Sequence, residues 1–497
     1  MIFNKVKGFK TVENKDFLRK AEELKPVLFK TKVVPTPSIS EPMGKGDTLL
    51  LDFLDHQVGY LHFHASSVGS PADAPAKIRI RYAERKEELE ENWDEYKGEI
   101  SSSWLQEETF FLDYLPVTIS LPRRHAFRYI EIKVIDTTPK YKVRLSHIHS
   151  ISVSSADYRL VPEINIKDKM LKRIDEVSLR TMHECMQEVF EDGPKRDARL
   201  WLGDLRLQAL GNYATFQNAD LVKRCLYLFA GSTMRDGRVG AGLFHKPKVQ
   251  VDDTILFDYS LFFVSTLKEY YDFTKDIETL KDLFPTAKRQ ISLSLLELDG
   301  KGIVKDHDNW WCFLDWGEGL NKQAGAQAIL ISALKDAKEM ASILGLDTAV
   351  YDTNIDTLTF AAKKYLFDEA KGLFVSGKKK QISWASQIYF VLSGIFDKET
   401  NRKILSNIEK EPHSIKMVTP FLHHYYVMAL LEVGEKEKAI SVIKSYWGDM
   451  ILDGADTFYE VYDPQNKRSS PYGDWVINSF CHAWSGTPSY FIRRHLG

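Results

Sequence analysis

The sequence predicts a mainly α fold: an (α/α)6 six-hairpin barrel preceded by an N-terminal β-sandwich domain. Two observations lead to this prediction. Up to about residue 160, apolar residues alternate with polar ones over short runs, whereas from about residue 161 they recur at helical spacing. We therefore expect a β-sandwich domain over residues 1–160 and a helical barrel over residues 161–497.

Short strand-sized runs fill the first region. Residues 77–82 alternate apolar and charged side chains, as a strand with one buried face must. Turn-forming residues such as Pro116 and Pro122 separate the runs, and short strands at this spacing are typical of an antiparallel sandwich. The acidic stretch 84–99 is interpreted as a solvated loop or a short helix. The other expected strands span residues 47–53, 59–65, 108–112 and 127–135.

About twelve segments of helical length follow Pro162. Thr419-Pro420 is typical of a helix start, with a capping side chain followed by proline at the first helical position. The connecting loops are long and rich in Trp, Asp and Gly, and a toroid of six helical hairpins gathers such loops at one end, where a site can form. The expected helices span residues 167–187, 205–216, 219–234, 258–273, 280–298, 322–344, 347–366, 386–394, 399–410, 419–432, 435–446 and 475–495.

Composition excludes several classes of partner. The chain has 497 residues, 44% of them hydrophobic and 27% charged, with a formal net charge of −2. This charge provides no basic surface for nucleic acid and no polybasic patch for a membrane. No apolar run approaches the roughly 20 residues that span a bilayer. We therefore expect neither a nucleic-acid partner nor a membrane partner.

Cysteine usage indicates the compartment. Cys185, Cys225, Cys312 and Cys481 are far apart and form no CxxC pair, which argues against a zinc site or a disulfide framework. Residues 1–7 lack the apolar core of a signal peptide. We expect a cytoplasmic protein without metal or cofactor. The oligomeric state stays open, with a homodimer as one candidate.

The stretch from Asp192 to Asp204 is the most informative feature of the chain. It places these two carboxylates, Asp197, Arg196 and Trp201 around a Gly-Pro turn that stiffens the backbone. A tryptophan among carboxylates suits a sugar, because the ring stacks on C–H faces while carboxylates accept hydrogen bonds from hydroxyl groups. The alternative interpretation is a helix cap at Asp204 with ion pairs on the surface.

Two later loops repeat this combination of residue types. Residues 309–318 contain three tryptophans and two acids, including Asp315 and Trp316, and form either a sugar platform or a buried structural cluster. Near the end of the chain, Glu460 lies between aromatic residues and His482 lies on an apolar stretch. A solvated glutamate and a core histidine are the alternative interpretations.

Carboxylates that are distant in sequence but flanked by aromatic residues point to glycoside hydrolysis. That reaction needs one acid to protonate the leaving oxygen and a second carboxylate to activate water or to attack. No metal motif, phosphate-binding loop or dinucleotide-binding glycine pattern competes with this interpretation.

Three segments resemble one enzyme family. Residues 192–197, Asp-x-Pro-x-Arg-Asp, continue to Gly203-Asp204 and resemble the acidic signature of the α-L-rhamnosidases of glycoside hydrolase family 78. Residues 457–460, Thr-Phe-Tyr-Glu, resemble that family's Thr-x-Trp-Glu segment, and residues 480–486 resemble its late histidine segment. The resemblance implies an (α/α)6 catalytic barrel, preceding β domains, and hydrolysis with inversion.

The resemblance also implies roles for individual residues. Glu460 would be the general base that activates water, and Arg196 would orient the neighbouring carboxylates. Trp316 matches a sugar-facing tryptophan, and Asp315 precedes it in the same segment. The residues implied to contact rhamnose are Asp192, Trp201, Asp204 and His482, and we add Asp315 and Trp316 to the expected binding residues.

One departure from the family pattern concerns the general acid. Many members carry Arg-Asp-Glu with the glutamate as acid, whereas this chain has Arg196-Asp197-Ala198. Other members are one residue shorter and place a single acid directly after the arginine, and Asp197 matches that form. We therefore predict Asp197 as the general acid, with Asp204 as the alternative.

The sequence thus predicts an inverting exo-α-L-rhamnosidase that removes terminal rhamnose from small glycosides or oligosaccharides. One alternative is another glycosidase on the same barrel. A catalytically silent carbohydrate-binding protein is the other, because Ala198 stands where many members have the acid.

Overall fold

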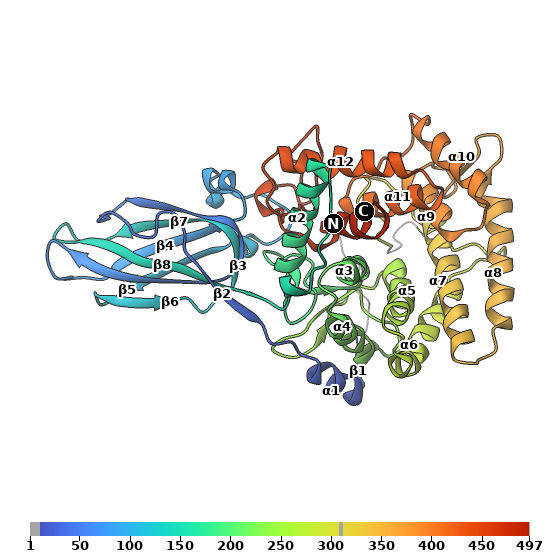
Figure 1. Cartoon of the computed structure of the whole chain (residues 1–497), viewed down its shortest axis with the longest axis horizontal. Coiled ribbons are helices and arrows are strands. Elements are labelled where there is room, and N and C mark those ends of the chain that lie inside the picture. Colours follow the sequence, from blue (N-terminus) through green and yellow to red (C-terminus); the bar gives the residue numbers. More distant parts are fainter. Residues whose placement is uncertain (1–9, 308–311, 497) are drawn as a thin grey trace.

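A computed structural model describes residues 10–307 and 312–496 of the chain. A β-sheet domain and a larger helical domain lie side by side along the long axis of the molecule (Figure 1). This arrangement confirms the expected order of an N-terminal β domain followed by a helical domain.

Seven strands form one antiparallel sheet in the order β2-β8-β3-β7-β4-β5, with β6 also paired to β3. The long strand β3 unites the two strands expected over 47–53 and 59–65, and its pairing with β7 is interrupted between Asp52 and Gln57. The strands span β2 Phe29–Val33, β3 Thr48–Val68, β4 Ala76–Ala83, β5 Glu107–Leu112, β6 Val117–Ser120, β7 His125–Asp136 and β8 Lys142–Ser154.

The sheet encloses a single apolar core. Alternate residues of β3, β4, β7 and β8 are buried, as the period of two requires. Leu51 and Phe63 of β3 meet Ile80 of β4, Ile132 of β7 and Val143 of β8 in this core.

The first described residues pack on the helical domain instead of on the sheet. Strand β1, Thr11–Glu13, pairs with β10, Ser232–Met234, and helix α1, Lys15–Glu23, lies against α4, Ala219–Gly231 (Figure 1). A division at residue 160 therefore follows the sequence order, while this segment belongs to the helical domain by its contacts.

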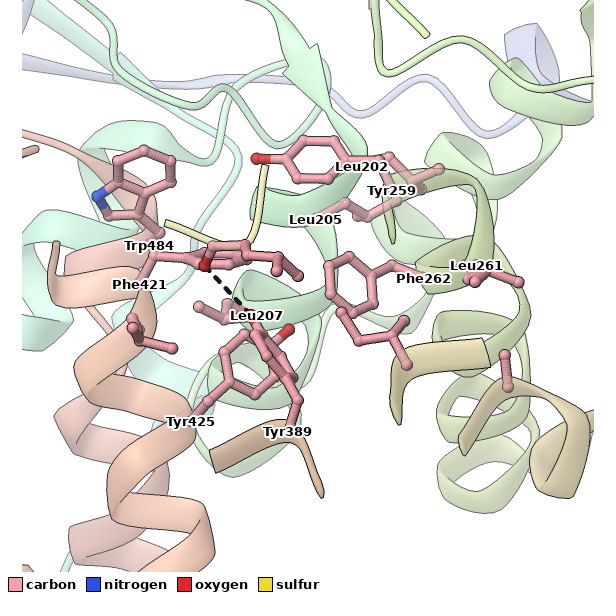
Figure 2. Packing of buried hydrophobic residues seen from close by; sticks show 14 of the residues in the cluster. Leu202, Leu205, Leu207, Tyr259, Leu261, Phe262, Tyr389, Phe421, Tyr425 and Trp484 are labelled. Atoms are coloured by element: carbon pink, nitrogen blue, oxygen red, sulfur yellow. Dashed lines mark hydrogen bonds between the residues drawn. The ribbon is translucent and has the colours of Figure 1, made fainter. Parts of the chain in front are cut away.

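Five long helices line the inside of the helical domain: α3, α5, α7, α9 and α11 contact one another in this order. They are apolar on nearly all sides, as buried helices must be. Figure 2 shows leucine, phenylalanine and tyrosine side chains of α3, α5, α9 and α11 packed together, with Trp484 next to Phe421 at the upper left. The inner helices span α3 Leu202–Ala214, α5 Phe257–Thr274, α7 Gln323–Ile343, α9 Trp384–Ser393 and α11 Pro420–Glu432.

An outer layer of helices completes the hairpins. Each outer helix packs against an inner one and keeps a solvent-facing polar side. As predicted, Thr419 caps α11 by accepting a hydrogen bond from the backbone N–H of Leu422, with Pro420 at the first helical position. The outer helices span α2 Lys169–Cys185, α4 Ala219–Gly231, α6 Ile277–Leu295, α8 Ala349–Ala361, α10 Lys398–Glu409 and α12 Lys436–Leu452.

The expectation of one continuous last helix over 475–495 is wrong. This region contains the short 3-10 turns Trp475–Ile477 and Ala483–Ser485, and only its end is helical, as the four-residue helix α13, Pro488–Phe491, continued by the π-helical turn Ile492–Leu496. The backbone of 476–483 instead bonds to other loops, and the turn Ala483–Ser485 and α13 close the inner ring against α3.

Two further sequence expectations concern the cysteines and membrane-spanning helices. The four cysteines are free thiols and all are buried. Within residues 10–307 and 312–496, no helix combines the length and the apolar character needed to cross a bilayer.

Candidate active site

The acidic loop, residues 192–199, is folded around the carboxylate of Asp192. Oδ2 of Asp192 accepts a hydrogen bond from the N–H of Asp197 at 3.3 Å, and Oδ1 accepts one from the N–H of Arg199 at 3.1 Å. A Cβ on Gly193 would lie 2.6 Å from the carbonyl oxygen of Arg196, so glycine is required for this tight path. The loop therefore presents Arg196 and Asp197 in a defined position.

Glu460 lies opposite this loop, in the segment that follows α12. Its Oε1 accepts a hydrogen bond from the hydroxyl of Tyr472 at 2.6 Å. Its Oε2 accepts hydrogen bonds from the guanidinium of Arg196 and from the N–H of Ser479, the latter at 3.4 Å. Charge-assisted hydrogen bonds of this kind stabilise a carboxylate in a buried place.

The guanidinium of Arg196 lies between two carboxylates. It contacts Glu460 through Nη2, and its Nη1 lies 3.8 Å from Oδ1 of Asp197. Its Nε donates a hydrogen bond to the carbonyl of Ile477 at 3.2 Å, and its Cζ lies 4.1 Å from the ring centre of Tyr472. One buried cation thus fixes the relative position of Asp197 and Glu460.

His482 faces three carboxylates. Its Nε2 lies 4.0 Å from Oδ2 of Asp192 and 4.0 Å from Oε1 of Glu460, while its Nδ1 lies 3.6 Å from Oδ1 of Asp204. Burial, helped by the charge of Arg196, holds the pKa of His482 well below its usual value. The imidazole is therefore neutral at physiological pH and can both donate and accept hydrogen bonds.

Asp204 is the second carboxyl group enclosed in this site. It lies in the first turn of α3, where negative charge is favoured, yet its Oδ1 has no hydrogen-bond partner among the described residues. Burial, with the nearby charges of Asp192 and Glu460, raises the pKa of Asp204 well above its usual value. Burial and the charge of Asp197 raise the pKa of Asp192 to about 8. Asp192 and Asp204 therefore take up protons far more readily than ordinary aspartates.

Two tryptophans lie beside residues that neighbour the carboxylates. Trp201 is half-buried on the short strand β9, Leu200–Trp201, and its ring stands edge-on to Tyr259 at 6.4 Å. Trp316 stands edge-on to Tyr472 at 5.4 Å and to Trp484 at 5.8 Å, which places it next to the partner of Glu460. The two other tryptophans of 309–318 lie outside the described residues.

Asp315 is bound by the start of α11. Its carboxylate accepts hydrogen bonds from the hydroxyl of Thr419 at 2.6 Å and from the N–H groups of Val418 at 2.8 Å and Thr419 at 3.1 Å. These three donors tie its loop to the start of α11. Its hydrogen bonds are thus made within the protein, and its role as a sugar contact stays a prediction.

The domain architecture matches known family models. Residues 19–152 match the N-terminal domain of glycosyl hydrolase family 78 α-rhamnosidases, and residues 161–496 match the six-hairpin glycosidase domain of bacterial α-L-rhamnosidases. The chain belongs to glycoside hydrolase family 78, the α-L-rhamnosidases. The helical model alone covers well over half of the chain, and membership makes the protein a glycoside hydrolase.

Solved structures agree with this membership. A rhamnosidase from Klebsiella oxytoca, with rhamnose bound, is 44% identical, with a TM-score of 0.95, and the alignment covers 98% of this chain and 100% of that one. A family 78 rhamnosidase from Bacillus sp. GL1 is 22% identical with a TM-score of 0.78, and the alignment covers 92% of this chain and 47% of that one. The second likeness concerns the fold alone. No curated protein matched the sequence.

Two aromatic residues of this candidate site were missed by sequence reasoning. Tyr472 binds Glu460 and stacks on Arg196, and Trp484 lies 4.3 Å from the ring of His482. Trp484 lies in the late histidine segment, two residues after His482, and this closeness in sequence could have indicated that it belongs to the same site. Tyr472 lies in an irregular stretch of mostly polar residues, where no pattern distinguished it.

Proposed function

We propose that this α-L-rhamnosidase removes terminal α-L-rhamnose from small glycosides or oligosaccharides by a single displacement with inversion. The observation that carries the proposal is the convergence of Asp192, Asp204 and Glu460 on the neutral imidazole of His482, beside the Arg196–Asp197 pair. These groups offer hydroxyl partners and two separately held carboxyl groups, as glycoside hydrolysis needs.

Glu460 acts as the general base. Its carboxylate is held by Arg196 and Tyr472 and lies 4.0 Å from Nε2 of His482, and it accepts a proton from the attacking water. Asp197 acts as the general acid on the leaving oxygen, since it stands across the guanidinium of Arg196 from the base. Inverting enzymes keep the two carboxyl groups about 6.5–9.5 Å apart. Because the guanidinium of Arg196 lies between Asp197 and Glu460, it supports a separation of the two carboxyl groups in this range. Asp204 remains the alternative acid.

Rhamnose is held by groups that still have free hydrogen-bonding capacity. Oδ1 of Asp204 and Nδ1 of His482 are buried and unpartnered within the described residues, so hydroxyl groups of the sugar would satisfy both. Trp201 and Trp316 offer ring faces to the C–H groups of the sugar. The bound rhamnose of the Klebsiella oxytoca relative supports rhamnose as the sugar.

A panel of aryl glycosides tests this proposal. We expect release of p-nitrophenol from the α-L-rhamnoside and no comparable release from other p-nitrophenyl glycosides. Glu460→Gln keeps the shape of the side chain but removes the base, and should lower turnover on the order of 10²–10⁴-fold without unfolding the protein. Preference for another glycoside, or near-normal turnover by Glu460→Gln, would reject the assignment.

A further inference from the structure

A buried charged cluster joins the two domains directly behind the acidic loop. It consists of His56, Glu84 and Glu88 from the sheet domain and Lys195 from the acidic loop. The four side chains are at most 2% exposed. The stretch 84–99 was expected to be a solvated loop or short helix, and it does form the short turns Lys86–Glu90 and Trp93–Glu95. Two of its acids are nevertheless buried, because they face a cation from the other domain.

Lys195 uses its ammonium group to connect three segments. It donates hydrogen bonds to the carboxylate of Glu88 and to the carbonyl oxygens of Val476 at 3.1 Å and Asn478 at 2.9 Å. An ammonium group has three donors, so this set satisfies it. Within the described residues, the carboxylates at salt-bridge distance from Lys195 both come from the sheet domain.

Glu84 binds the segment around residues 476–480 as well, at a different residue from those that Lys195 binds. Its Oε2 accepts a hydrogen bond from the N–H of Phe480 at 2.6 Å, and its Oε1 is bound by Nε2 of His56 at 3.0 Å. We call residues 476–482 the tail segment. Its carbonyl groups bind Lys195 and Arg196, and it ends at His482.

We propose that Glu84 and Glu88 are positioning residues for the active site of the helical domain. Their charges fix Lys195 and the tail segment, and these in turn keep Arg196 against Glu460. This inference rests on the proposed role of Glu460 as general base. Among the residues that the structure describes, neither glutamate forms a hydrogen bond or an ion pair with Asp192, Asp204 or His482, so both act through their neighbours.

A buried charge such as that of Lys195 needs a partner. Removing the solvent from an ammonium group costs free energy that only a nearby anion and hydrogen-bond acceptors offset. When Glu88 becomes neutral, Lys195 keeps its charge in a buried place and must move towards solvent or lose its proton. Either change loosens the carbonyl groups of Val476 and Asn478 and so the tail segment.

Glu88→Gln tests the inference, because it removes the charge and preserves the shape. We expect faster amide hydrogen exchange in the tail segment and a kcat on p-nitrophenyl α-L-rhamnoside lowered about 10- to 100-fold, with KM changed less. Glu84→Gln should act in the same direction. Glu90→Gln is the matched control: it lies in the same short turn but is exposed, and it should behave as the wild type.

A double variant separates positioning from stability. Glu88→Gln with Lys195→Met removes both charges, so the melting temperature should recover towards the wild-type value while kcat stays low. Recovery of kcat together with the melting temperature, or unchanged exchange and kcat in Glu88→Gln, would overturn the inference. Hydrogen exchange needs no substrate. If the wild type fails to hydrolyse rhamnosides, the proposed function falls while the exchange result still decides whether these glutamates hold the tail segment.

Discussion

Oδ1 of Asp204 lies 3.6 Å from Nδ1 of His482, and among the residues that the structure describes neither atom has a hydrogen-bond partner. Buried polar atoms are almost always paired, because an unpaired one costs free energy. Both atoms belong to the group that also contains Asp192 and Glu460. We therefore interpret the pair as the place where hydroxyl groups of the sugar bind.

Asp204→Ala should weaken rhamnose binding strongly. A hydrogen bond contributes about 0.5–1.5 kcal/mol between neutral groups and about 1.5–3 kcal/mol to a charged group, which corresponds to roughly 2- to 150-fold in the dissociation constant. Calorimetric titration of the variant with rhamnose measures this change. Asp220→Ala, an exposed aspartate in the first turn of α4, is the control and should bind as the wild type does. Equal affinity of both variants would exclude Asp204 from the sugar site.

Asp197→Asn should separate substrates by their leaving group. If Asp197 is the acid, the variant loses most activity on glycosides with poor leaving groups and far less on aryl glycosides, because a phenol needs little protonation. Comparing kcat/KM for the two substrate types on this variant checks the assignment. An equal loss on both would mean that Asp197 only positions the sugar, and the acid must then be sought at Asp204 or Asp192.

Tyr472→Phe should lower kcat while the protein stays folded. The hydroxyl of Tyr472 donates to Oε1 of Glu460, whereas its ring packs on Arg196, and phenylalanine keeps only the ring. Loss of one hydrogen bond to a charged group predicts roughly a tenfold decrease or more. Tyr462→Phe, which loses a hydroxyl that binds Asp449 at 2.6 Å, serves as the control. Identical kinetics of the two variants would argue against a role for Tyr472.

Asp192 makes stability depend on pH. Its folded-state pKa of about 8 lies above the ordinary value of about 3.9 expected in the unfolded chain. Its contribution to stability is therefore complete below about pH 4 and is lost as the pH rises through 8. The melting temperature of Asp192→Asn should rise relative to the wild type between pH 5 and pH 8.

Scanning calorimetry at these two pH values measures the effect of Asp192→Asn. Asp113→Asn, at an exposed position, controls for the removal of a negative charge. A constant offset between Asp192→Asn and the wild type at both pH values would contradict the raised pKa.

Much of the fold could be predicted from local sequence signals. The change from a period of two to helical spacing placed the two domains in order, and Thr419-Pro420 marked the start of α11. The region 475–495 was expected to form one helix, but only its end is helical. Its conformation is set instead by bonds to distant loops, such as the N–H of Ala483 to the carbonyl of Asp192, which no local pattern contains.

The candidate site, too, could be predicted from the sequence only in part. Three motifs predicted that Asp192, Asp204, Glu460 and His482 belong together, and the structure brings them within one cluster, while their chemical roles remain predictions. Asp315 stood beside Trp316 in an aromatic loop but is bound by the start of α11. The buried acids Glu84 and Glu88 could not be recognised, because charged residues are usually solvated and their cation comes from the other domain.

The most direct measurement follows the anomeric signals of rhamnose by proton NMR during hydrolysis of p-nitrophenyl α-L-rhamnoside by the wild-type protein. A single displacement by water activated at Glu460 predicts that β-L-rhamnose forms first and that the α-anomer appears only later, by mutarotation. Appearance of α-L-rhamnose first would show retention and contradict the account, because Glu460 would then have to act as a nucleophile.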